Sequence, residues 1–576
     1  MRSRFAAGMW LAVCALGIGI VLITQACSGS SSSSTSSNSD PAPTQQAANY
    51  PLPQVTVGER LFLETRFAEY FAVHMTGIND PLPAGDPVVS QVPTTSNPLP
   101  GPFAGQSINC RSCHLVTEFE SVAGAGNRTY ADFTTRSPLP RAINGFDHTP
   151  RNAEVMVGSL RSGPGATFLH SDGEFVDPVG LVESTLTGRN LGWSPDQQSQ
   201  AIAHIARVIR EDNGSSQLAM QRTGGLSYST LFLGTVTGTP VQFDVPPLYQ
   251  LDVQVATDQQ VLNAVANFIV AYMQALQFHQ SRGVYTGSPY DAFLAANGLP
   301  RLPASNETPA QYNQQLLRML NVLQNPTFIT GANRSFLYHS QPFVFGSTEL
   351  AGLKVFLSSA PGATDGSQHA GNCASCHIAP DFTDHIFHCT GVSQEEYDAA
   401  NGSGAFMDLS VPSRAARNAN YNQYLPMTLN HPMASESFRH MAMPGQPQFA
   451  DLGLWNVYLN PDIPAPQKAL ASVVCAAGID CSVDQGLANT IAQFKTPTLR
   501  DLEDSNPYFH NGSKLTLPDV INFYIASSQL ARQGKLRNAP SQFQDMSIDQ
   551  SDVSALAAFL RSLTEDYDDN HIANQN

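Results

Sequence analysis

The stretch Cys373-Ala374-Ser375-Cys376-His377 decides the fold, because its pattern also occurs upstream as Cys110-Arg111-Ser112-Cys113-His114. In a CxxCH site, two thiols add to the two vinyl groups of one porphyrin, and the adjacent His binds the iron. Two complete copies therefore predict two covalently bound haem c groups. We expect their axial ligands to be His114 and His377.

One isolated CxxCH could also be a zinc or redox CxxC beside a chance His. A zinc ion would need four ligands in a tetrahedral array. No second CxxC and no paired His lies near either motif in the sequence to complete such a set. Two copies in one exported chain therefore favour haem over zinc.

The composition favours an exported, loop-rich protein. The chain has 576 residues, of which 42% are apolar and only 13% are charged. This length allows two to four domains with real cores. The formal charge of -17 argues against nucleic acid as a partner, because phosphates would be repelled. It allows a basic protein partner such as a small cytochrome, although a solvated acidic surface explains it equally well.

The N-terminus reads as an export signal. Arg2 and Arg4 precede an apolar run over 5–23, which is too short for a confident spanning helix. The residues up to Cys27 resemble a bacterial lipobox, with Thr24 as the unusual member. We therefore predict a lipoprotein-type signal over 1–27, a Ser-rich flexible tether over 28–50, and a periplasmic protein anchored to the outer membrane.

Three cysteines remain outside the signal and the haem motifs. Cys475 and Cys481 are six positions apart, which predicts a disulfide in an oxidising compartment. Cys389 is left without a predicted partner.

Apolar periodicity predicts a mainly α fold with long loops and insertions. Helices are expected over 194–211, 261–276 and 553–563, and a short strand over 228–236. Because the two motifs are far apart, each is expected in its own c-type cytochrome domain with one covalent haem. The predicted boundaries are 51–285 for the first domain, 286–345 for a linker or insertion, and 346–570 for the second domain.

Further short motifs resemble the bacterial dihaem cytochrome c peroxidase family, which also contains the MauG-type enzymes. They occur in the family's order, with longer connections than usual over 300–345 and 395–490. Besides the two haem motifs, they are Gly58 to Phe62, Thr149-Pro150-Arg151-Asn152, His170-Ser171-Asp172-Gly173, Ser288-Pro289-Tyr290-Asp291, Phe387-His388, Phe494 to Arg500 and Pro507 to Gly512.

The resemblance implies a division of labour between the two haems. The haem on His114 would react with hydrogen peroxide, and the haem on His377 would relay electrons from a small cytochrome c or a cupredoxin. A reactive iron needs a vacant position, whereas an iron with two strong protein ligands only transfers electrons. A homodimer is common among such peroxidases.

The resemblance places the distal ligand of the second haem at Tyr524, fourteen residues past His510. The peroxidases have a Met there, whereas the MauG-type enzymes have a Tyr. A phenolate lowers the reduction potential and a thioether raises it. Tyr524 could instead simply pack. The rival ligands lie in one Met-rich segment that also holds His431 and His440, and they are Met427, Met433, Met441 and Met443.

The family's distal acid position falls near Leu191 and is lost in this chain. Glu183 is the nearest carboxylate for moving the peroxide proton, and Arg189 is a cation for the departing hydroxide. His148 could cap the iron in a resting state. A solvated Glu, a structural Arg and a loop His are the plain alternatives for these three candidate catalytic residues.

Two further positions follow from the resemblance. The family's Trp between the haems is replaced by Ser171, for which Trp193 or His170 could substitute. A calcium ion between the domains is implied by Asn152 and Pro507, with Ser505 where Thr is usual, because hard oxygen ligands suit calcium.

Three functions therefore remain open at the level of sequence. The first is a peroxidase that reduces hydrogen peroxide with electrons from a small redox protein. The second is a MauG-like oxidase or oxygenase that acts on an organic or protein substrate through high-valent iron, favoured by Tyr524. The third is a non-catalytic dihaem electron-transfer cytochrome.

Overall fold

The structure is a computed structural model of the 576-residue chain. The residues that it describes are 51–88, 107–114, 120–121, 127–128, 139, 147–161, 166–234, 238–336, 339, 341–359, 369–475, 483–503 and 505–566. The predicted signal over 1–27 and the tether over 28–50 lie outside these ranges, so both stay predictions. Within the described part of the chain, no helix combines the length and the apolar character that a membrane crossing requires.

The described chain is mainly α-helical, as predicted. Its strands have two residues each and form three antiparallel pairs. These pairs are β1 (Glu120–Ser121) with β2 (Asn127–Arg128), β3 (Gln280–Ser281) with β4 (Val284–Tyr285), and β5 (Phe387–His388) with β6 (Phe494–Lys495).

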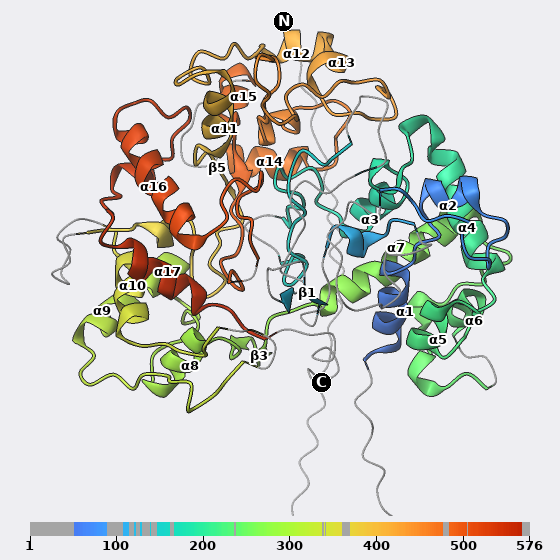
Figure 1. Ribbon diagram of the computed structural model, residues 1–576, viewed down its shortest axis with the longest axis horizontal. Helices are drawn as coiled ribbons and strands as arrows, with labels where there is room; N and C mark the ends of the chain where they lie inside the picture. The colour runs from blue at the N-terminus through green and yellow to red at the C-terminus, as the bar shows by residue number, and fades with distance from the viewer. Residues whose placement is uncertain are drawn as a thin grey trace, which may run out of the picture. The chain divides into compact units, whose positions relative to one another are not determined.

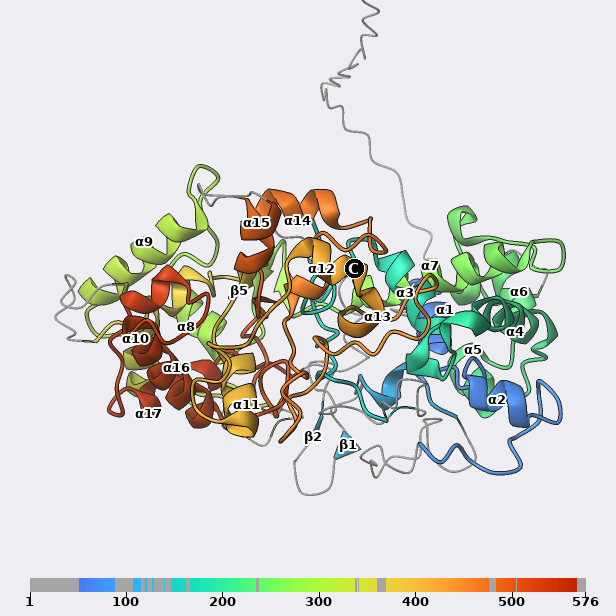
Figure 2. The ribbon, with the colours of Figure 1, turned by 90° about the horizontal axis from the view of Figure 1, so that it is seen from above.

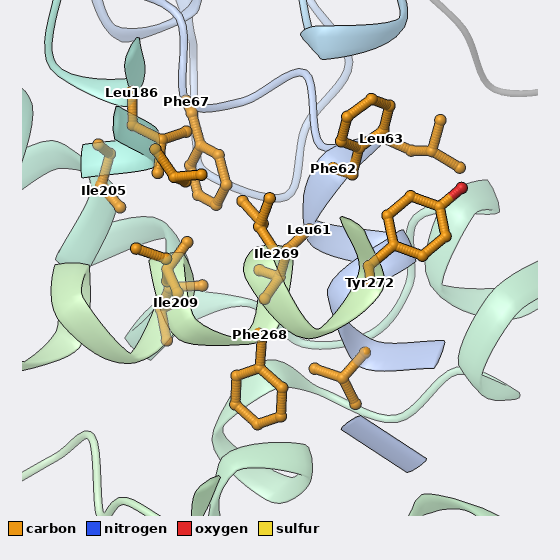
Figure 3. Close-up of a cluster of buried hydrophobic side chains, with 14 of the residues drawn as sticks. Leu61, Phe62, Leu63, Phe67, Leu186, Ile205, Ile209, Phe268, Ile269 and Tyr272 are labelled. Carbon is orange, nitrogen blue, oxygen red and sulfur yellow. The ribbon is translucent and has the colours of Figure 1, made fainter. Parts of the chain in front are cut away.

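The first cluster of helices surrounds one apolar core that draws on residues between 55 and 285. Its helices are α1 (Pro53–Phe62), α2 (Glu69–His74), α3 (Pro178–Leu186), α4 (Gln198–Glu211), α5 (Gln217–Thr223), α6 (Tyr228–Leu233) and α7 (Asp258–Ala275). Figure 3 shows Phe268 and Ile269 of α7 among side chains from α1, α3 and α4. The predicted helices over 194–211 and 261–276 correspond to α4 and α7.

The second cluster has a separate core that draws on residues between 290 and 563. Its helices are α8 (Pro289–Ala296), α9 (Pro309–Val322), α10 (Ser347–Leu357), α16 (Leu517–Arg532) and α17 (Val553–Arg561). The predicted closing helix over 553–563 is α17. The first core ends at Tyr285 and the second begins at Tyr290. The segment over 286–345, predicted as a linker or insertion, contains α8 and α9, which contribute to the second core. The described residues all belong to one compact unit, and the predicted domain boundaries stay predictions.

The long connection over 395–490 builds most of a third core, which also includes Phe168 and Phe387. Its helices are α11 (Val392–Asn401), α12 (Arg414–Ala419), α13 (Tyr421–Tyr424), α14 (Gln467–Val474) and α15 (Val483–Asn489). The sequence identified this segment only as a connection longer than is usual in the family that the chain resembles. Tertiary packing makes it an integral part of the protein.

The strand predicted over 228–236 is wrong, because Tyr228–Leu233 forms helix α6. The Ser227 side chain caps this helix by accepting a hydrogen bond from the Thr230 amide at 3.2 Å. Tyr228, Leu231 and Phe232 are fully buried at helical spacing. β-branched and aromatic residues suggested a strand, but the cap and the helical spacing of the buried residues decide the structure.

Each of the first two clusters depends on a close helix crossing at a glycine. Helix α1 packs against α7, and α10 packs against α17, as Figures 1 and 2 show. A Cβ atom on Gly58 would lie 2.0 Å from the Phe268 carbonyl oxygen, and one on Gly352 would lie 1.9 Å from that of Ala555. Only glycine allows the two backbones to approach this closely.

We predict that Gly352→Ala lowers the free energy of unfolding by about 2 kcal/mol or more, because the added methyl group meets backbone that cannot move aside. Gly331→Ala is the matched control, since a Cβ there meets nothing within 4 Å. Urea unfolding of the two variants checks this, and equal stabilities would contradict the proposed crossing.

A buried ion cluster ties α1 to the rest of the first cluster. Arg60 Nη2 lies 2.7 Å from Asp212 Oδ2, and Arg66 Nη2 lies 2.7 Å from Glu64 Oε2 and 2.9 Å from Asp212 Oδ1. The Tyr228 hydroxyl donates to Glu64 Oε2 at 2.9 Å. Burial alone would raise the pKa of Glu64, but the charge and hydrogen bonds of Arg66 lower it to about 2.

This pKa makes the stability depend on pH. Because the pKa of Glu64 falls from its ordinary 4.5 to about 2, its contribution is complete above about pH 4.5 and disappears as the pH falls towards 2. The shift corresponds to about 3 kcal/mol. We therefore expect Glu64→Gln to be less stable than the wild type at pH 7 and to lose less stability between pH 5 and pH 3. Parallel acid unfolding curves would contradict this prediction.

Candidate functional site

The second CxxCH motif forms one turn of 3-10 helix over Cys373–Ser375, followed by His377. His377 Nδ1 lies 3.0 Å from the carbonyl oxygen of Phe382. A metal-bound His usually donates its other ring N–H in this way, which directs Nε2 to the metal. Burial lowers the pKa of His377, so the imidazole is held neutral, as iron ligation requires.

The first motif repeats this arrangement over Cys110–Ser112 and His114. His114 Nδ1 lies 2.8 Å from the Glu154 carbonyl oxygen, and burial lowers the pKa of His114 as well. Asn109 fixes the turn to helix α1, since its side-chain amide donates to the Leu63 carbonyl at 2.7 Å. Both motifs therefore present Nε2 of a neutral, oriented imidazole.

A cavity of about 330 Å³ opens beside the second motif. Cys373, Cys376, His377 and Tyr524 all line it. Much of the remaining wall is apolar, including Phe356, Leu517, Ile521, Phe543 and Leu560. An apolar cavity against two thiols and one imidazole fits a porphyrin.

Tyr524 lies on α16 and reaches the same cavity as His377. Its ring packs against Phe509, Phe523 and Phe543 with centroids 5.5 to 6.1 Å apart. Burial raises the pKa of Tyr524, and the neighbouring Cys373 and Cys376 raise it further. Tyr524 therefore lines the same cavity as His377, and its role as a distal ligand stays a prediction.

The four rival methionines do not lie at this cavity. Among its lining residues the methionine is Met546, which comes from the segment before α17. Met427, by contrast, contacts Glu436 through its backbone amide. Sequence spacing could not find Met546, because only the fold brings its segment against the second motif.

One described group at the second motif could hold an ion. Cys376 approaches Asp384 and His388 closely enough for the three to share an ion, and Asp384 Oδ2 lies 2.7 Å from His388 Nε2. Cys373 is not part of that group. Burial raises the pKa of Cys110 and of Cys373 to about 12.

The candidate catalytic residues of the first haem lie in three places. Glu183, on α3, is half-buried and accepts a hydrogen bond from Asn263 of α7 at 3.0 Å. Arg189 follows α3 and pairs with Glu436 at 3.0 Å. His148 is partly exposed and lies 2.8 Å from the Asp147 carboxylate. Their catalytic roles stay predictions.

The segment that stands where the family has its bridging Trp reaches the cavity of the second motif. Ser171 lines the cavity that holds His377. His170, the residue before it, has its Nδ1 3.1 Å from Glu174 Oε2. Trp193 instead belongs to the first core, where its indole N–H donates to the Phe67 carbonyl at 3.0 Å. The roles suggested for His170 and Trp193 stay predictions.

The predicted calcium ligands Asn152 and Pro507 meet in the structure. Asn152 Nδ2 lies 3.1 Å from the Pro507 carbonyl oxygen and 2.8 Å from that of Phe509. Asn152 Oδ1 is buried without a partner in the described chain, and Ser505 is also buried. A turned amide would place this oxygen beside the carbonyls, a set of hard donors that suits calcium.

Sequence reasoning missed a buried ionic network beside this segment. Arg151 binds both carboxylate oxygens of Asp451, at 2.6 and 2.7 Å, and reaches Asp172 at 2.5 Å. Arg439 reaches Glu174 at 2.6 Å. The network joins the first CxxCH side of the chain to the third core. Its members are far apart in sequence, so no local motif could indicate it.

Comparison with known proteins supports the resemblance. A stretch of 72 residues is 38% identical to the cytochrome-c peroxidase IdrP2 of Denitromonas iodatirespirans, covering 12% of this chain and 17% of that protein. The chain resembles the dihaem cytochrome c peroxidases. A stretch of 74 residues is 30% identical to IdrP1 of the same organism, covering 13% of this chain and 18% of that peroxidase.

The matching stretches span less than a fifth of these curated peroxidases. No family model matches the chain. Among solved structures, the dihaem peroxidase BthA of Burkholderia thailandensis is 16% identical with a TM-score of 0.39, covering 92% of this chain and 89% of that one. A MauG-like protein associated with microbial copper homeostasis is 14% identical with a TM-score of 0.40, covering 93% of this chain and 97% of that one.

The cysteines outside the signal and the haem motifs are Cys389, Cys475 and Cys481. Cys475 is disulfide-bonded, and its predicted partner Cys481 lies outside the described residues. Cys389 is a buried free thiol whose Sγ donates to the Arg537 carbonyl at 3.1 Å.

We predict that Tyr524→Phe changes the spectrum of one haem only. Removal of the hydroxyl deletes the oxygen ligand but keeps the ring, so the second haem should change from low-spin to high-spin while the fold is retained. EPR spectra of the oxidised variant and wild type check this. Tyr70→Phe is the control, because it also removes one hydroxyl but Tyr70 does not line this cavity. An unchanged Tyr524→Phe spectrum would show that Tyr524 only packs.

Proposed function

We propose that this chain is a dihaem c-type cytochrome peroxidase that reduces hydrogen peroxide to water with electrons from a small cytochrome c or cupredoxin. The overall step consumes one peroxide, two protons and two electrons and yields two water molecules. The observation that carries the proposal is the repeated CxxCH turn, in which His114 and His377 each have Nδ1 against a backbone carbonyl.

The covalent haems would be attached through Cys110 and Cys113 in the first motif, and through Cys373 and Cys376 in the second. When bound, they supply the redox chemistry of the reaction. The protein contributes orientation, since Glu154 and Phe382 fix the tautomers of the two ligating histidines. Tyr524 lines the cavity of the second haem, and a second protein ligand there would favour an electron-relay role.

At the first haem, the chain's own residues would handle protons and charge. Glu183 is the proposed proton carrier, and its contact with Asn263 restricts its position. Arg189 is the proposed cation for the departing hydroxide. His148 is partly exposed, which suits a resting-state cap that can move away more than a fixed catalytic group.

The setting of the enzyme is part of the proposal. Asn152, Ser505 and Pro507 would hold a calcium ion that joins the segments beside the two motifs. Cys27 would carry a lipid that anchors the protein to the outer membrane on the periplasmic side. The net charge of -17 favours a basic electron donor.

A MauG-like oxidase or oxygenase is the second candidate. Its support is Tyr524, which lies in the cavity of the second motif where a peroxidase would have Met. Such an enzyme would act on an organic or protein substrate, and it would consume peroxide without oxidising a small cytochrome.

The test uses purified holoprotein. We expect a pyridine haemochrome assay to give two haems per chain, and each Cys-to-Ser pair, at Cys110 with Cys113 or at Cys373 with Cys376, to remove one. Addition of peroxide should then oxidise a reduced cytochrome c with two electrons per peroxide. Peroxide consumption without cytochrome oxidation would favour the MauG-like alternative. Two low-spin haems whose spectra do not change with peroxide would contradict both enzymatic functions. The remaining function would then be that of a non-catalytic electron-transfer cytochrome.

A further inference from the structure

The long connection over 395–490 places a buried carboxylate against the proposed distal cation. Glu436 Oε1 lies 3.0 Å from Arg189 Nη1, and their side chains are 2% and 22% exposed. We propose that Glu436 is a positioning residue that holds Arg189 for the reaction with peroxide. This inference rests on the proposed function, because it assigns a task to the Arg189 of that reaction.

The same carboxylate oxygen has a second partner. Glu436 Oε1 also accepts a hydrogen bond from the Met427 backbone amide at 3.1 Å. Two donors on one oxygen fix the carboxylate in a single orientation, so Arg189 meets a fixed acceptor rather than a mobile surface side chain. A buried charge-assisted contact of this kind is also stronger than an exposed one.

The backbone of Glu436 is held in an unfavourable conformation. Its φ is +52°, in the left-handed region that non-glycine residues rarely adopt. A residue in this conformation is strained, and it persists when surrounding contacts require it. Here the adjacent segment pairs through Phe438, whose carbonyl oxygen lies 2.9 Å from the Leu452 amide, so the chain cannot relax.

The second carboxylate oxygen of Glu436 accepts no hydrogen bond in the described part of the chain. Its Oε2 is buried and has no hydrogen-bond partner within the described ranges. A buried carboxylate oxygen without a hydrogen-bond partner destabilises the folded chain, because it has lost its contacts with water. Strain and desolvation together indicate that the position is kept for its contacts with Arg189 and Met427 rather than for general stability.

The segment around Glu436 is rigidly attached to the side of the first motif. Arg439, three residues further on, pairs with Glu174 at 2.6 Å and with Asp172 at 3.4 Å. Asp451 binds Arg151 through both oxygens. These pairs give Glu436 a fixed frame from which it can orient Arg189.

The test compares variants of the oxidised holoprotein by azide binding at the reactive haem, and then by KM and kcat for peroxide. Arg189→Gln should weaken azide binding about tenfold, because a cation near the iron stabilises a bound anion. Glu436→Asp keeps the charge but is one methylene shorter, so it should weaken azide binding about as much. Glu436→Gln keeps the acceptor oxygen and should stay within about threefold of wild type.

Three further results complete the test. The variant that combines Arg189→Gln with Glu436→Asp should bind azide no more weakly than either single variant. The reason is that both substitutions act through the same group, the Arg189 guanidinium. Glu395→Gln is the control, since its carboxylate is 44% exposed and pairs with Lys514. Urea unfolding of all variants separates a local effect from a loss of stability.

Two results would overturn the proposal. The first is that the losses of azide affinity add up in the combined variant. The second is that Glu436→Asp lowers stability but leaves azide binding and kcat unchanged. If Arg189→Gln leaves azide binding unchanged in a protein that turns over peroxide, the positioning role fails and the peroxidase stands. If no variant, wild type included, turns over peroxide, the proposed function fails, while the azide series still decides whether Glu436 positions Arg189.

Discussion

The close crossing of two helices at a glycine is the constraint on which both CxxCH motifs depend. Gly58 lets α1 reach the backbone of α7, and Gly352 lets α10 reach the backbone of α17. In each case, residues just before the motif are hydrogen-bonded to the end of the first helix. The Asn109 side-chain amide donates to the Leu63 carbonyl oxygen at 2.7 Å, and the Gly371 amide donates to the Val355 carbonyl oxygen at 2.9 Å. No sequence repeat beyond the motifs connects the two clusters.

The site combines rigid local turns with contacts that are very distant in sequence. Each motif is a short turn, and its His is oriented by a carbonyl from a following loop. The surroundings come from elsewhere, since Tyr524 lies on α16 and Met546 lies before α17. The connection over 395–490 adds buried ion pairs to Arg151, Asp172, Glu174 and Arg189. A segment that looks like an insertion thus forms part of the site.

Much of the fold class and of the motif chemistry could be predicted from the sequence. Helical spacing of apolar residues indicated α4, α7 and α17. The composition of 228–236 wrongly suggested a strand. The N-cap and the burial of one helical face outweigh the strand preference of these residues. The resemblance placed Asn152 beside Pro507 and Tyr524 beside the second motif, and the structure brings these groups together. It could not indicate that Arg189 pairs with Glu436, since their spacing carries no periodic signal.

By itself, the sequence determined the two CxxCH motifs, the export signal prediction and the mainly helical class, because these depend on local spacing and composition. Only the tertiary structure decided which residues face one another across the clusters. The strained backbone of Glu436 and the paired carboxylates around Arg151 and Arg439 exist because long-range packing fixes both sides of each contact. Burial and charge pairing between distant segments are properties of the folded chain, and no stretch of sequence contains them.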